Sequence, residues 1–171
     1  EAIVAVVVPI LVAIGLLMVS TIPYPAFNGG EARIISLLRC LKDKYRFSLL
    51  TFFEPNAKAR GLAGALILER NLLHKVHLVE RKPEKPSKKS WMPPYAQNCR
   101  SKEMAARLRA LIRKESIDLV QVEFNEMAQY TLEARGKVPV VFTEHDVSIL
   151  SRLRSYLPEA RDWGPGRSWN L

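Results

Sequence analysis

The chain has 171 residues, of which 48% are hydrophobic and 25% are charged, and this globular composition excludes a largely disordered protein. Its length allows one domain with a well-buried core and excludes two large domains. The formal net charge of +9 favours anionic partners, and the two cysteines lack the spacing of a metal site or of a disulfide framework.

The first residues form the most apolar segment of the chain. Residues 2–19 carry no charge and reach the length at which a membrane span is considered. However, Pro9 interrupts the run, and residues 16–21 fit a buried strand equally well, which leaves residues 1–15 too short to cross a bilayer. No basic region precedes them, so they make a poor signal peptide. Two interpretations of residues 1–15 stay open: the remnant of a membrane anchor, or a segment extraneous to the domain.

A turn with two glycines follows the first expected strand. It ends at Gly29 and Gly30 and leads into an expected helix over residues 31–45. Glycines let a backbone approach a ligand closely, and a helix N-terminus offers N–H groups and partial positive charge. The turn has neither the spacing of a dinucleotide fingerprint nor the Lys-Ser/Thr of a P-loop. A site for a polar ligand and a plain corner both remain open.

Strands and helices alternate along the rest of the chain. The patterns predict strands over residues 46–53, 75–80, 117–124 and 138–146, and helices over residues 57–73, 101–115 and 125–137. Strands that are almost continuously apolar and alternate with helices are typical of a parallel sheet covered on both faces. The sequence therefore predicts an α/β fold with such a sheet.

Residues 81–102 form a basic, proline-rich loop in which Glu84 is the one acid. Its positive charge would attract phosphates, anionic lipid headgroups or nucleic acid, of which nucleic acid fits worst because no recognition motif is present. Trp91 could enter a membrane interface or fix the loop to the domain. We expect a membrane or acceptor patch here, with a solvated loop as the alternative; its residues are Lys85, Lys88, Lys89 and Trp91.

Ligands of parallel sheets bind where the strands end, and three segments of this chain follow strands in that way. They are residues 23–30, 123–125 and 143–146, and the fold would bring them to one edge. His145 lies between Glu144 and Asp146 and could donate a hydrogen bond to a hydroxyl or act as a base. The alternative is a surface histidine with chance acidic neighbours. Three histidines in all are too few for a metal phosphohydrolase.

Three stretches resemble the N-terminal domain of retaining GT-B glycosyltransferases of the family 4 type. They are MVSTIPYPAFNGGEARIISLLRCL, IDLVQVEFNEMAQY and VPVVFTEHDV, and the resemblance covers residues 16–154. It implies a Rossmann-like half that mostly holds the acceptor and faces a second half that binds a nucleotide-sugar. It further implies that His145 is the catalytic residue that contacts the donor sugar. The implied substrate-binding residues are Gly29, Gly30, Arg33, Glu123, Glu144 and Asp146.

The resemblance implies transfer of a sugar from a nucleotide-diphosphate-sugar, the co-substrate, to a hydroxyl of a glycan, a lipid-linked acceptor or a small molecule, without an essential metal. The expected setting is cell-envelope glycan synthesis in the cytoplasm, peripheral on or anchored to the inner face of the membrane. Residues 155–171 do not resemble the start of the family's donor-binding domain, so we expect that domain to be missing and the chain alone to be inactive. The alternative is a non-catalytic Rossmann-like binding module, with or without a membrane anchor.

Overall fold

Five strands form one sheet in the computed structural model, which describes residues 13–82 and 92–144. Every strand pairing is parallel, and the strand order is β3-β2-β1-β4-β5. The strands are β1 (Ile14–Val19), β2 (Arg46–Phe53), β3 (Lys75–Glu80), β4 (Leu119–Glu123) and β5 (Val140–Thr143). The helices are α1 (Gly29–Leu41), α2 (Lys58–Asn71), α3 (Pro94–Gln97), α4 (Lys102–Lys114) and α5 (Thr131–Ala134), with 3-10 helices η1 (Pro55–Ala57) and η2 (Asn125–Tyr130). The prediction of a parallel, Rossmann-like α/β fold is confirmed.

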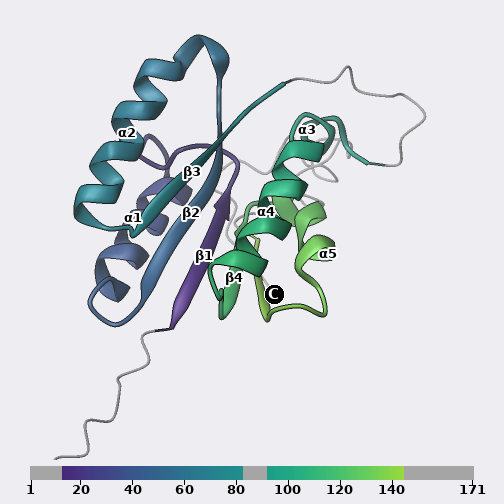
Figure 1. Ribbon diagram of the computed structural model, residues 1–171. Helices are drawn as coiled ribbons and strands as arrows, with labels where there is room; N and C mark the ends of the chain where they lie inside the picture. The colour runs from purple at the N-terminus through teal and green to yellow at the C-terminus, as the bar shows by residue number, and fades with distance from the viewer. Residues whose placement is uncertain (1–12, 83–91, 145–171) are drawn as a thin grey trace, which may run out of the picture.

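The helices cover both faces of the sheet, with α1 and α2 on one side and α3, α4 and α5 on the other (Figure 1). Successive residues of a strand point to opposite faces, and β1 shows this directly. Leu17 and Val19 pack in the core beneath α1 and α2, whereas Leu16 and Met18 pack in the core beneath α4. Near-continuous apolar strands are therefore needed because each strand supplies two cores at once.

Several element boundaries differ from the sequence-based expectations. Strand β1 begins at Ile14, whose N–H donates to Asp118 Oδ2 at 2.7 Å, so two residues of the apolar N-terminal segment pair within the sheet. The helix expected over residues 125–137 is mostly the 3-10 helix η2, which follows Phe124 with its positive φ of 71°. In residues 13–82 and 92–144 no helix is both long enough and apolar enough to cross a membrane.

Two capping interactions are formed as their residue types favour. The Asn28 side chain accepts a hydrogen bond from Glu31 N at 2.9 Å and starts α1, and the Ser101 hydroxyl accepts from Met104 N at 3.2 Å and starts α4. Both helices begin near the carboxyl ends of the strands, because each follows a strand of a parallel sheet. That edge is where ligands of such folds bind.

Candidate functional site

The first turn of α1 lies at the carboxyl edge of the sheet, directly after the loop from β1. The buried Glu31 carboxylate ties this loop to the helix, since it accepts from Phe27 N at 2.7 Å and from the Thr21 hydroxyl at 3.4 Å. Among the described residues, the N–H groups of Gly29 and Gly30 donate to no protein acceptor. They offer donors and a partial positive charge to a ligand.

Arg33 on α1 and Glu123 at the end of β4 form an ion pair across 90 residues of sequence, with Nη1 at 3.1 Å from Oε2. The Glu123 side chain is fully buried, whereas 47% of the Arg33 side chain is exposed. Gln121, two residues earlier on the same face of β4, donates to the other Glu123 oxygen. The carboxylate is thus satisfied inside the protein, and it orients a guanidinium that still faces solvent.

The two glycines of the turn have different surroundings. A Cβ on Gly30 would lie 2.8 Å from Cε1 of Phe124, so this glycine lets the aromatic ring pack against the start of α1. A Cβ on Gly29 would meet no atom within 4 Å. Neither has a positive φ, so a larger side chain would not strain either backbone. Gly30 is therefore explained by packing inside the protein, whereas Gly29 leaves open space beside the free N–H groups.

The end of β5 joins this edge through β4. Phe124 N donates to the Thr143 carbonyl oxygen at 3.2 Å, and Asn125 Nδ2 donates to Glu144 Oε1 at 3.0 Å. The three segments expected at one edge are therefore side by side as far as residue 144. His145 and Asp146 lie outside the described residues, as do the predicted patch residues Lys85, Lys88, Lys89 and Trp91.

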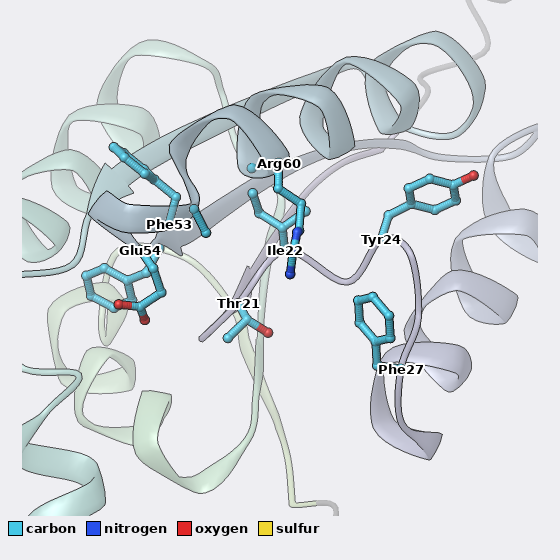
Figure 2. A pocket seen from close by; sticks show the side chains of 10 residues that line it. Thr21, Ile22, Tyr24, Phe27, Phe53, Glu54 and Arg60 are labelled. Carbon is cyan, nitrogen blue, oxygen red and sulfur yellow. The ribbon is translucent and has the colours of Figure 1, made fainter.

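A pocket of about 140 Å³ opens at the same edge, between the loop after β1 and the start of α2 (Figure 2). Most of its lining is apolar, and Arg60 extends into it from α2 while Glu54 closes it at the end of β2. Gly64 allows α2 to pack onto the loop, since a Cβ there would lie 2.8 Å from the Tyr24 carbonyl oxygen. Its lining residues are Thr21, Ile22, Tyr24, Phe27, Phe52, Phe53, Glu54, Ala57, Arg60 and Gly61.

Arg81 turns inward, although the sequence places it in the basic loop. Its Nε lies 2.7 Å from Glu54 Oε1 in an ion pair, Nη1 donates to Cys99 Sγ at 3.2 Å, and Nη2 donates to the Ser20 carbonyl oxygen. The guanidinium also lies 5.0 Å above the Phe52 ring. Its charge is used to join the ends of three strands, so it does not belong to an exposed anion-attracting surface.

The segment after α3 is held to the domain by buried groups. The Tyr130 hydroxyl donates to the Cys99 carbonyl oxygen at 2.6 Å and accepts from Ser101 N at 2.9 Å. Burial raises the pKa of the Tyr130 hydroxyl and the pKa of the Cys99 thiol above their usual values, so both are neutral at physiological pH. They support the site and carry no charge. Within the described ranges no cluster of three His, Cys, Asp or Glu could hold a metal ion.

Comparison with protein families gives a match. The family model of Glycosyltransferase Family 4 matches residues 27–170, which is most of the chain and includes α1 and the ends of β4 and β5. The chain belongs to glycosyltransferase family 4. A comparison with curated proteins found no match. As a family 4 glycosyltransferase domain, the chain has a sugar donor and an acceptor as its partners in general terms.

The candidate site includes residues that the sequence did not single out. Phe124 and Gln121 shape the end of β4, and Arg60 and Glu54 border the pocket. One signal was available for Gln121, because polar side chains at two core-facing positions of a buried strand are unusual and require buried partners. No local signal marks Phe124 or Arg60, because their positions depend on packing between distant elements.

Proposed function

We propose that this family 4 chain is the acceptor-side domain of a retaining glycosyltransferase that transfers a sugar from a nucleotide-sugar to a hydroxyl acceptor. The observation that carries the proposal is the arrangement of free helix N–H groups and the Arg33–Glu123 pair at one edge of the sheet. Both features favour a phosphorylated ligand, since they provide N–H donors and an oriented guanidinium. Family membership supports the sugar-transfer chemistry.

The proposal gives the residues at this edge the following roles. The open space at Gly29 admits the donor phosphates, and Arg33 donates its remaining N–H groups to them. His145, two residues beyond the end of β5, contacts the donor sugar, and Glu144 and Asp146 hold substrate hydroxyls. The acceptor enters from the pocket bordered by Glu54 and Arg60. No metal is required in this proposal, because side-chain and helix charges stabilise the leaving diphosphate.

Gly29 and Gly30 provide a matched pair of variants that tests the proposal. Gly29→Val is expected to leave the melting temperature within a few degrees of the wild type, because its Cβ meets no protein atom. It should nevertheless lower kcat/KM at least tenfold, a loss of about 1.4 kcal/mol in transition-state binding. Gly30→Ala should instead lower stability, by about 1–3 kcal/mol, because the Phe124 ring must move. The measurements are thermal unfolding and donor turnover by the protein of the complete reading frame.

Turnover is measured as hydrolysis of a panel of nucleotide-sugars by water, a side reaction that requires no identified acceptor. If Gly29→Val keeps the wild-type kcat/KM, the turn does not bind the donor phosphates and only connects β1 to α1. Absence of hydrolysis and of nucleotide-sugar binding by the wild type would contradict sugar transfer itself and favour a non-catalytic binding module.

Membrane association through the basic loop is also a proposal. Lys85, Lys88, Lys89 and Trp91 would bring the domain to an anionic bilayer on the cytoplasmic side, where lipid-linked acceptors for cell-envelope glycans reside. The positive net charge of the chain supports this proposal.

A further inference from the structure

Helix α2 is apolar on both of its faces. Gly61, Gly64, Ala65 and Leu68 are buried against the sheet and the loop after β1. On the outer side, Leu62, Leu66 and Ile67 are 46%, 55% and 39% exposed. Ala59 and Ala63 are exposed between them. A surface helix normally alternates an apolar and a polar face, so an apolar outer face indicates a further covering layer.

Basic residues border this outer face. At 100° per residue, Lys58 lies next to Leu62 on one side of the apolar strip. Arg70 follows Leu66 by four residues and places a positive charge at the C-terminal end of the strip. The one acid of the helix, Glu69, is used inside the protein, where Oε1 accepts from Val76 N at 2.6 Å. The outer face therefore combines apolar side chains with the positive charges of Lys58 and Arg70, which form no ion pair with any described residue.

We propose that the outer face of α2 is a docking surface for an anionic lipid bilayer. The charge pattern favours a bilayer over other partners. Helices that lie in a membrane interface typically combine leucine and isoleucine with neighbouring lysine and arginine. A protein partner or a second copy of this chain would have to bury the flanking charges. Lipid phosphates lie at the depth where lysine and arginine side chains extend from an interfacial helix.

The proposed membrane contact adds detail to the proposed function. It rests on that function in one respect, because it assumes an acceptor that is carried by a lipid. Arg60 and Gly61 line the pocket from the same helix, so a bilayer on the outer face lies next to the pocket. Phe27, which is 76% exposed at the pocket, and the apolar lining would accept the part of a lipid-linked acceptor that leaves the bilayer. Acceptors of this class combine a hydroxyl or sugar head with an apolar chain.

Vesicle sedimentation tests the surface without requiring catalysis. The full chain is mixed with vesicles of phosphatidylcholine alone or with 30% phosphatidylglycerol (a composition of about one anionic lipid in three). The double variant Leu62→Glu/Leu66→Glu should lower the partition coefficient on anionic vesicles at least tenfold. A matched control is Leu132→Glu on α5, since Leu132 is 69% exposed but lies on the opposite face of the sheet. Its binding should equal that of the wild type.

Each result decides the proposal. Wild-type binding by the double variant, or loss of binding in the Leu132→Glu control, overturns it, and so does failure of the wild type to bind anionic vesicles. If only the variant Lys85→Gln/Lys88→Gln/Lys89→Gln loses vesicle binding, the basic loop makes the membrane contact instead. If the wild type binds no vesicles but self-associates with rising concentration, and the double variant does not, the outer face of α2 binds a second copy of the chain. Circular dichroism confirms that the variants fold. Donor hydrolysis by the protein of the complete reading frame shows separately whether the proposed function holds.

Discussion

At the scale of single residues, the most informative feature is a charge buried on a strand that should be apolar. Burial of a carboxylate is costly unless it is paired and hydrogen-bonded, and Glu123 has both Arg33 and Gln121 as partners. The pair joins the first turn of α1 to the end of β4, so it fixes the geometry of the edge. Half of the Arg33 side chain is exposed, which leaves the guanidinium accessible to a ligand.

Removal of the Arg33 guanidinium tests both roles. Arg33→Met should lower the free energy of unfolding by about 1–3 kcal/mol, because a fully buried carboxylate loses its cationic partner. Arg33→Lys should restore part of the stability but little activity, since lysine lacks the forked donors. Arg39→Met on the same helix is the control, because Arg39 is exposed in the last turn. Equal denaturation midpoints for Arg33→Met and Arg39→Met would show that the pair contributes nothing to stability.

At the scale of elements, β3 and α4 meet through a histidine. His77 Nε2 lies 3.5 Å from Oε1 of Glu115, which caps the C-terminus of α4. Burial has the largest effect on the pKa of His77 and lowers it. The Glu115 carboxylate raises this pKa, and the positive charges of Lys75 and Arg107 lower it further. The histidine thus joins two elements of the fold, and its burial favours the neutral form in the folded state.

A pH dependence of stability follows from His77. Because its pKa is lower in the folded than in the unfolded protein, the unfolded state binds the proton more readily. The stability contributed by neutral His77 is present above the unfolded pKa of 6.5 and is lost as pH falls below it, through the lower pKa of the folded state. Urea unfolding between pH 7.5 and about pH 5 should show this decline, and His77→Gln should make it shallower. Identical slopes for the two proteins would contradict the assignment.

At the scale of the whole molecule, the pocket that the described residues form at the carboxyl edge is smaller than a nucleotide-sugar requires. The pocket there has about 140 Å³, whereas sites for ligands of this size enclose about 300–1,000 Å³. The polar groups beside it form one wall, with free N–H donors and a half-exposed Arg33. A second, donor-binding domain facing this edge would complete the site.

We therefore expect residues 1–171 alone to hydrolyse or transfer sugar poorly or not at all. Catalysis of this kind depends on positioning and on charges arranged around the leaving group, and one wall supplies only part of them. The comparison is donor turnover by residues 1–171 and by the protein of the complete reading frame, at equal concentration. Robust turnover by residues 1–171 would show that the described edge suffices.

Much of the fold could be predicted from the sequence because its signals are local. The alternation of apolar strands and amphipathic helices, and the caps at Asn28 and Ser101, depend on residues within a few positions of one another. The rule that ligands bind at strand ends also located Glu123 and Glu144 at one edge. Element boundaries were less certain, as η2 shows, because the positive φ of Phe124 has no local signal.

By itself, the sequence determined the order of the elements, the parallel sheet and the strand-end segments that meet at its carboxyl edge. Only the tertiary structure decided which distant residues touch: Arg33 with Glu123, Gly30 with Phe124, and Arg81 with the ends of three strands. The physical reason is the distance along the sequence over which each interaction acts. Periodicity and capping act over one or two turns, whereas pairing across 90 residues depends on how two cores pack on the two faces of one sheet.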